Sequence, residues 1–322
     1  MKSVQLLLLV ILALSCSKDD SVQNELLFEK GLLENQTINI SGVNRGYHLY
    51  IPQNYTNAPV VLLFHGNKIN NNVILGINGG KAPYKVWLEL AERENLILIV
   101  PNGTGDSNDS NGWNDCRNDA TGNPVTDDVL FTNNLMDFVI NKYQANAAKV
   151  FAVGTSNGGH MAMRLAQEIP NRLSAFAAIV TANPQNSQCI NSTVPISALF
   201  MNGTEDPILP DEGGSMAGER GKVFSAQETI DYWVNRNETE ITPVTTDIDN
   251  RNEADGSTVK KHLFVNGIDS TEVAFYEIIG GGHTEPSILE RYTDLFLDTF
   301  GLGNQNGDIE MANEVWNFFK AK

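Results

Sequence analysis

Two uninterrupted apolar runs constrain the fold of this chain more than any other feature. PVVLLFH occupies residues 59–65 and LILIV occupies residues 96–100. Such runs are typical of strands that are buried on both faces, as in a parallel sheet. A segment with helical spacing lies between them at 84–93. Because parallel strands need crossover connections, we expect a sheet that is covered by helices.

The same alternation of strands and helices continues to the end of the chain, after an antiparallel pair at 36–41 and 45–51. A long loop rich in Gly, Asn, Asp and Ser fills residues 102–123. We therefore predict one α/β domain over residues 35–322, with a mostly parallel central sheet and helices on both faces. Further strands are expected at 149–153, 175–180, 196–201, 259–265 and 273–278, and helices at 129–143, 158–167, 225–235, 288–300 and 309–319.

Residues 1–15 are predicted to be a lipoprotein signal peptide. Lys2 precedes an apolar stretch from Val4 to Leu14, and a small residue stands directly before Cys16. This arrangement resembles the lipobox of bacterial lipoproteins, in which the cysteine thiol carries a diacylglycerol. Residues 16–34 are interpreted as a polar tether, so we expect an exported protein anchored to the outer membrane. The alternative is ordinary secretory cleavage with an incidental Cys16.

The charge balance excludes some partners. The chain has 22 Lys and Arg against 39 Asp and Glu, a net charge of −17. A nucleic-acid-binding protein needs a basic face for the phosphates, so no nucleic-acid partner is expected. Acidity also disfavours adsorption to an anionic membrane, which leaves the lipid anchor as the expected membrane contact. No His, Cys and carboxylate cluster has zinc-ligand spacing, and we predict neither a metal nor an organic cofactor.

A G-x-S-x-G motif at residues 154–158 gives the first indication of chemistry. It follows a predicted buried strand and opens a predicted helix, which is the strand–turn–helix context of a nucleophile elbow. The motif therefore predicts Ser156 as a nucleophile. The alternative is a glycine-rich turn without a catalytic role.

A serine nucleophile needs a base and an acid that orients the base, in the chain order Ser, acid, His. Three histidines follow Ser156, and only His283 comes after a strand and a Gly-Gly-Gly turn at the correct edge of the sheet. Asp206 and Glu205 both follow the strand predicted at 196–201, and the sequence pattern leaves both open as the acid.

The oxyanion of an ester reaction needs two fixed donors. We expect one to be the backbone N–H of Asn157, at the start of the helix. The second is expected from the loop after the strand at 59–65, as the backbone N–H of Gly66 or Asn67. The alternative for this loop is an ordinary βα turn.

Seven ordered segments resemble the secreted esterase family that contains polyhydroxybutyrate depolymerases and feruloyl or acetylxylan esterases, which have the α/β-hydrolase fold. They are VVLLFHG (60–66), GWNDC (112–116), DDVLF (127–131), VFAVGTSNGGHMAMRLA (150–166), NGTEDPILPDEGG (202–214), GGGHTEP (280–286) and NGDIEMANEVWNFF (306–319). The resemblance implies Ser156 as nucleophile, Asp206 as acid and His283 as base.

The resemblance also implies residues at the substrate pocket. The GW segment of the family projects over the site, so Trp113 is expected to touch substrate, with packing inside the loop as the alternative. Family members often carry Trp after the catalytic His, and here Glu285 stands at that place. We therefore expect Trp113, His65 and Glu285 to line the pocket.

Cys116 and Cys189 remain once Cys16 is assigned to lipid. Their loops are expected to leave from the same edge of the sheet, on either side of the elbow strand, so we predict a disulfide between them. The alternative is two separate thiols.

These observations favour a serine esterase that acts on feruloyl or acetyl esters of plant polysaccharide fragments. A lipid-tethered enzyme is poorly suited to an insoluble polyester granule, which makes a polyhydroxybutyrate depolymerase the second choice. A peptidase on the same fold and a non-catalytic surface-binding lipoprotein are further alternatives.

Overall fold

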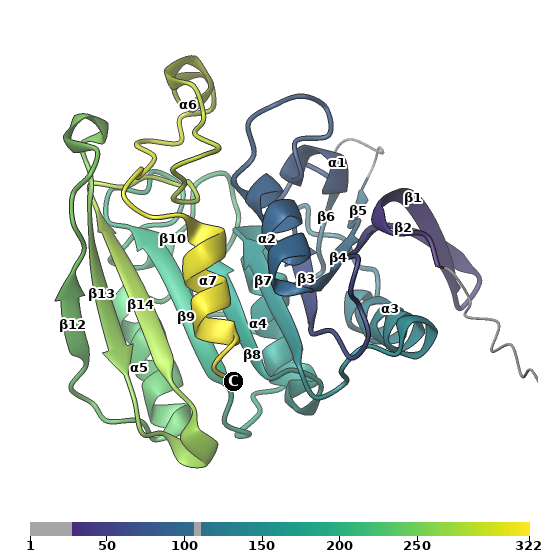
Figure 1. Ribbon diagram of the computed structural model, residues 1–322. Helices are drawn as coiled ribbons and strands as arrows, with labels where there is room; N and C mark the ends of the chain where they lie inside the picture. The colour runs from purple at the N-terminus through teal and green to yellow at the C-terminus, as the bar shows by residue number, and fades with distance from the viewer. Residues whose placement is uncertain (1–27, 106–110) are drawn as a thin grey trace, which may run out of the picture.

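The computed structural model describes residues 28–105 and 111–322 (Figure 1). The predicted signal peptide, Cys16 and most of the predicted tether lie outside the described residues. None of the helices in the described part of the chain is long and apolar enough to cross a membrane.

A ten-stranded sheet forms the centre of the molecule, in the order β1-β2-β4-β3-β7-β8-β9-β14-β13-β12. The six strands from β4 to β14 in this order run parallel, and the strands at both edges are antiparallel. The predicted mostly parallel α/β sheet is confirmed. The strands are β1 (Gly31–Ile40), β2 (Val43–Ile51), β3 (Val60–Phe64), β4 (Ile97–Pro101), β7 (Val150–Thr155), β8 (Ala175–Ile179), β9 (Ser197–Gly203), β12 (Val244–Asp247), β13 (Thr258–Phe264) and β14 (Val273–Ile279).

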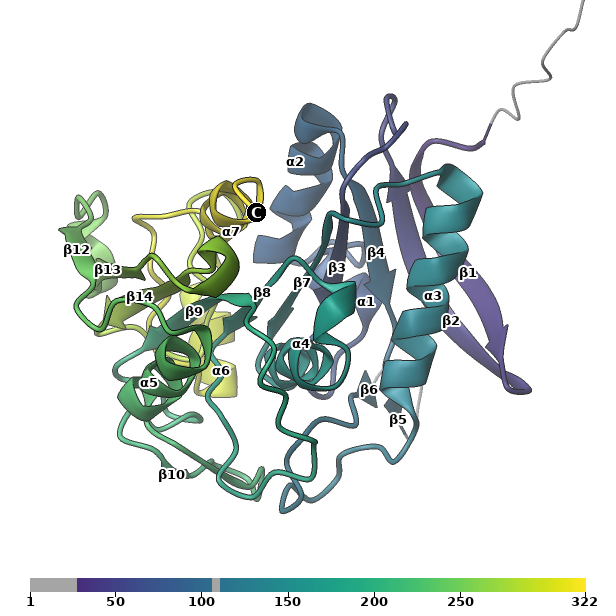
Figure 2. The same ribbon diagram turned by 90° about the horizontal axis from the view of Figure 1, so that it is seen from below.

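Helices cover both faces of the sheet, as Figure 2 shows from below. The helices α2 (Val86–Glu94) and α7 (Met311–Phe319) lie on one face. The opposite face carries α3 (Asp128–Tyr143), α4 (Asn157–Glu168) and α5 (Ala226–Asn237). Alternate residues of each central strand enter separate cores on the two faces, because successive side chains of a strand point to opposite sides. All five residues of β3 are therefore fully buried.

Three elements differ from the sequence prediction. Strand β1 begins at Gly31, inside the range predicted as tether. Strand β12 was not predicted, because all four of its residues are exposed and carry no buried pattern. The helix predicted at 288–300 begins only at Asp294, as α6 (Asp294–Phe300). The backbone N–H groups of Ile288 and Leu289 donate to the Glu310 carboxylate instead, which holds the preceding residues in a loop.

Short elements and long loops gather beyond the carboxyl ends of the central strands, at the top of Figure 1. This is the edge where α/β sheets bind their ligands. The short elements at this edge are α1 (Asn71–Ile74), β5 (Thr104–Gly105), β6 (Asn111–Gly112), β10 (Gly214–Ser215) and β11 (Lys222–Val223), with 3₁₀ turns at Pro83–Lys85 and Glu253–Asp255. Two further 3₁₀ turns, Pro170–Arg172 before β8 and Ile268–Ser270 before β14, lie at the opposite edge of the sheet.

Candidate active site

Ser156 lies on a sharp turn between β7 and α4. Its backbone has φ 53° and ψ −118°, a conformation that costs a non-glycine residue about 1–3 kcal/mol. Neighbouring glycines make the turn possible. A Cβ on Gly154 would lie 2.1 Å from the carbonyl oxygen of Gly158, and one on Gly158 would lie 2.3 Å from that of Phe64. The sequence therefore folds into a tight elbow that keeps the Ser156 side chain partly exposed.

His283 and Asp206 contact each other at the same edge of the sheet. Asp206 follows β9 and His283 follows β14, which is the neighbouring strand. The distance from His283 Nδ1 to Asp206 Oδ2 is 2.6 Å. The other carboxylate oxygen of Asp206 accepts the backbone N–H groups of Ile208 at 2.7 Å and Leu209 at 2.8 Å. The carboxylate is thus held by three donors and fixes the orientation of the imidazole.

Glu205 was the other acid that the sequence left open. Its side chain is exposed, and its backbone N–H donates to Gly281 O at 3.0 Å. Of the two candidates, the structure brings Asp206 to His283.

The loop after β3 lies against the elbow. A Cβ on Gly66 would be 3.8 Å from Ser156 Cβ, so the absence of a side chain lets this backbone approach the serine closely. Asn67 follows and is half-buried. The backbone N–H of Asn157 is the first of α4, and such N–H groups have no partner within the helix. Two of the sequence-predicted oxyanion residues, Asn157 and Gly66, therefore adjoin Ser156, and Asn67 follows Gly66 in the same loop.

His65 holds this loop from inside the protein. Gly103 N–H donates to His65 Nε2 at 3.0 Å, so the ring proton is on Nδ1, which donates to Gly66 O at 2.7 Å. Burial lowers the pKa of His65 to about 4 and keeps the ring neutral. In a trans peptide the carbonyl and the following N–H point in opposite directions. By holding the carbonyl of Gly66, His65 therefore fixes the direction of the Asn67 N–H.

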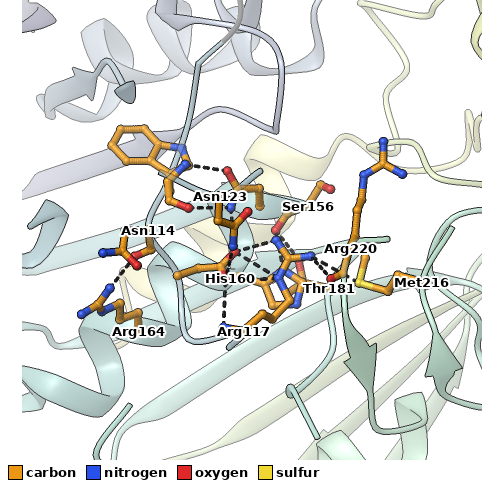
Figure 3. A network of polar contacts seen from close by, with 12 residues as sticks. Asn114, Arg117, Asn123, Ser156, His160, Arg164, Thr181, Met216 and Arg220 are labelled. Carbon is orange, nitrogen blue, oxygen red and sulfur yellow. Dashed lines mark hydrogen bonds and ion pairs between the residues drawn. The ribbon is translucent and has the colours of Figure 1, made fainter. Parts of the chain in front are cut away.

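A buried polar network fixes the other donor, and Figure 3 shows it from close by. Asn157 Oδ1 accepts Trp113 N–H at 2.7 Å, and Asn157 Nδ2 donates to Asp115 Oδ2 at 2.6 Å. Asp115 also forms an ion pair with Arg117 at 2.6 Å and accepts Asn123 Nδ2 at 3.0 Å. Burial alone would raise the pKa of Asp115, but the adjacent Arg117 guanidinium holds that pKa below its usual value.

His160 supports the elbow from the next turn of α4. Its Nδ1 lies 3.0 Å from Ser156 O, and Thr181 Oγ1 donates to the same oxygen at 3.2 Å. Burial, together with the charge of Arg117, lowers the pKa of His160 to about 3. The ring is therefore neutral and donates through Nδ1. The sequence motif gave no indication of Asp115 and Arg117 as a support for the elbow, although both lie in or beside the GWNDC segment.

Two of the three residues expected at the substrate pocket are placed elsewhere. Trp113 is fully buried, and its Nε1 donates to His65 O at 2.8 Å. His65 is fully buried as well. Packing inside the loop, the alternative for Trp113, is what the structure has. Glu285 does line a cavity of about 430 Å³, where its carboxylate accepts the Tyr292 hydroxyl at 3.0 Å.

Two of the cavities at this edge of the sheet are lined by sequence-predicted site residues. The 430 Å³ cavity is largely apolar and includes Ile74, Tyr84 and Phe296 besides Glu285. A second cavity of about 600 Å³ is lined by Asn67 and otherwise mainly by polar residues and glycines. Across residues 28–105 and 111–322, no three His, Cys, Asp or Glu side chains are grouped so that they could hold a metal ion.

The loops above the elbow are joined covalently. Cys116 and Cys189 form a disulfide, with their Cα atoms 5.1 Å apart. Gln188 N–H also donates to Cys116 O at 2.8 Å. The loop after β4 and the loop after β8 therefore meet, with β3 and β7 between those strands in the sheet.

Comparisons with known proteins agree on one family and one fold. A family model described as "Putative esterase" matches residues 39–272. Feruloyl esterase D of Neurospora crassa is 30% identical over 180 residues, which cover 54% of this chain and 57% of that protein. Feruloyl esterase C of Emericella nidulans is 31% identical over 180 residues, 54% of this chain and 61% of that protein. The chain thus spans about three fifths of the length of these curated relatives.

A solved structure extends the likeness to the fold. The acetyl xylan esterase from Aspergillus awamori superposes with a TM-score of 0.52 over 84% of this chain and 99% of that chain. Its sequence is 18% identical, so this match concerns the α/β-hydrolase fold.

Proposed function

This chain belongs to the esterase family whose model matches residues 39–272, and we propose from this that it is a carboxylic ester hydrolase with Ser156, His283 and Asp206 as its catalytic triad. The observation that carries the proposal is the 2.6 Å contact between His283 and Asp206 at the edge of the sheet where Ser156 occupies a strained elbow. Strain of this kind is concentrated at functional sites.

In the proposed reaction, Ser156 Oγ attacks the ester carbonyl carbon while His283 Nε2 takes the serine proton. Asp206 keeps the proton of His283 on Nδ1 and stabilises the imidazolium. The backbone N–H groups of Asn157 and of Gly66 or Asn67 bind the oxyanion. His283 then protonates the leaving alcohol, and water hydrolyses the acyl-enzyme by the same steps.

The proposed substrates are feruloyl or acetyl esters on plant polysaccharide fragments. The names of the curated relatives and of the solved structure support this class. The largely apolar 430 Å³ cavity supports an aromatic acyl group, because Tyr84 and Phe296 line it. Glu285, which is two residues after His283 in the sequence, lines the same cavity.

We also propose that the protein is exported and lipid-anchored through Cys16. The support is the apolar stretch from Val4 to Leu14 followed by a small residue and cysteine. Replacement by Cys16→Ser should move the protein from the membrane fraction to the soluble fraction. A protein that stays in the membrane fraction after this change would contradict the anchor.

The test of the activity compares purified wild type, Ser156→Ala and Ser174→Ala on methyl ferulate, acetylated xylan, p-nitrophenyl butyrate and polyhydroxybutyrate. Ser156→Ala should lose several orders of magnitude in kcat, because covalent catalysis is removed. Ser174 lies at the opposite edge of the sheet, just before β8, and its replacement should have little effect. Full activity of Ser156→Ala would refute the assignment of Ser156 as nucleophile. A wild-type protein that is inactive on all four esters would refute the proposed esterase activity.

A further inference from the structure

The 600 Å³ cavity adjoins the elbow. Asn67 and Gly112 both line it. A Cβ on Gly112 would lie 2.9 Å from Asn67 Oδ1 and 3.1 Å from Asn157 Oδ1, so this wall of the cavity reaches both oxyanion residues. Thr121, Asn123 and Thr126 are among the polar residues on the remaining wall. A group bound here would therefore sit next to the ester that Ser156 attacks.

Two cations line this cavity, and no acidic side chain among the described residues pairs with either. They are Lys68 and Arg220, and neither forms an ion pair with any residue in the described ranges 28–105 and 111–322. The contrast with Arg117 is clear, because that neighbouring guanidinium is paired with Asp115. The cavity therefore presents two positive charges in a chain whose net charge is −17.

Arg220 is the more constrained of the two. Its side chain is half-buried, and its Nη1 donates to the carbonyl oxygen of Ala217. Burial, followed by the charge of Arg117, lowers the pKa of Arg220. Figure 3 shows the guanidinium extended away from the network around Arg117. The remaining N–H groups of the guanidinium fork are those that bind a planar anion in a bidentate manner.

We propose that the 600 Å³ cavity binds an anionic sugar of the substrate, and that Arg220 and Lys68 recognise its carboxylate or sulfate group. This inference rests on the proposed esterase function, because it places the anionic sugar beside the ester bond. Asn, Thr and backbone groups supply the hydrogen bonds that sugar hydroxyls need. The substrate class is then an ester on an acidic polysaccharide, in which a uronic acid or a sulfated sugar neighbours the acylated position.

A different role for the two cations would be to stabilise the oxyanion directly. That role would act on every ester and would give no preference for a charged sugar. Direct binding of sugars without an ester bond separates the two roles, since no oxyanion forms in such a measurement.

The experiment measures the dissociation constants of ester-free sugars by calorimetry at about 0.15 M salt, which screens the overall negative charge of the protein. The probes are trigalacturonate and galactotriose, which differ in their carboxylates, and a galactose-4-sulfate disaccharide with its neutral counterpart. Wild type should bind at least one anionic probe about tenfold more tightly than the matched neutral sugar. The anionic probe that binds more tightly identifies the anionic group.

Variants assign the binding to the two residues. Lys68→Gln and Arg220→Gln should each weaken binding of the anionic probe about tenfold and leave that of the neutral probe unchanged. Arg220→Lys should restore part of the loss, which a variant that merely disturbs the loop would not do. Lys81→Gln, at the other cavity, and Arg251→Gln are matched controls that remove the same charge elsewhere.

Equal binding of anionic and neutral probes by wild type would overturn the proposal. So would equal losses in the two control variants. Because no probe carries an ester, these results are independent of the activity screen with Ser156→Ala.

Discussion

At the level of single residues, the hydrogen bonds of Asp206 determine which nitrogen of His283 carries the proton. Asp206 Oδ1 accepts two backbone N–H groups, from Ile208 and Leu209, so an oxygen is required at that place. Oδ2 faces His283 Nδ1 at 2.6 Å. Oδ2 therefore accepts a hydrogen bond from His283 Nδ1–H, and the proton of the imidazole is held on Nδ1. His283 Nε2 is then left as the acceptor that a serine base needs.

This arrangement predicts the effect of Asp206→Asn. The amide oxygen must stay against the N–H groups of Ile208 and Leu209, so the amide NH₂ would face His283 Nδ1. His283 would then carry its proton on Nε2 and could not accept the serine proton. We expect kcat on methyl ferulate or p-nitrophenyl butyrate to fall by about four orders of magnitude with the fold retained.

The adjacent carboxylate provides the control for this prediction. Glu205→Gln makes the same chemical change on an exposed side chain and should alter kcat by no more than a few-fold. If Glu205→Gln caused the large loss and Asp206→Asn did not, the assignment of the acid would be reversed.

At the scale of the element, the buried ion pair of Asp115 and Arg117 ties the loop after β4 to the first turn of α4. Asn157 is the link, because its side chain contacts both Trp113 N–H and the Asp115 carboxylate. The side chains of Asp115 and Arg117 are 0% and 2% exposed. A buried pair of this kind is strongly destabilising when one partner is removed, since the other charge stays uncompensated.

Asp115→Asn should therefore lower the free energy of unfolding by about 3–5 kcal/mol, measured by urea denaturation. The matched control is Asp137→Asn. Asp137 pairs with Arg172, but its side chain is 50% exposed, and such pairs contribute about 0–1 kcal/mol. Similar losses in the two variants would show that the buried pair has no special structural role.

The same elements show what the sequence could predict. The buried strands, the elbow at Ser156 and the candidate residues Asp206 and His283 were predicted, because apolar runs and chain order carry that information. The choice between Asp206 and Glu205 needed the family resemblance. The support from Asp115 and Arg117 was not predicted, since it depends on contacts between residues that are 40 or more positions from Asn157. Trp113 was placed in the substrate pocket, and the structure buries it instead.

At the scale of the whole molecule, the polar groups that support the elbow are embedded between the two hydrophobic cores and the loops above the sheet. His65 and His160 are both buried and neutral there, on opposite sides of Ser156 in the sequence. His48 is a third buried histidine, whose pKa is lowered by burial. Protonation of these buried histidines is therefore unfavourable in the folded state, whereas the unfolded chain protonates them readily. The free energy of unfolding should consequently depend on pH.

The sign of this dependence follows from the two pKa values. The pKa of His65 is lowered to about 4 and that of His160 to about 3, against about 6.5 in an unfolded chain. Above pH 6.5 both rings are neutral in both states and contribute no pH dependence. As the pH falls from 6.5 towards 4, the unfolded state binds more protons, so each ring lowers the free energy of unfolding by about 1.4 kcal/mol per pH unit.

Urea denaturation at pH 7.5, 6, 5 and 4.5 should therefore give a stability that falls steadily below pH 6.5. His160→Asn should reduce the slope by about 1.4 kcal/mol per pH unit, because Asn can still donate to Ser156 O but does not titrate. A stability that stayed constant from pH 7.5 to 4.5 in the wild type would show that the buried histidines accept protons without unfolding, contrary to their burial at the elbow.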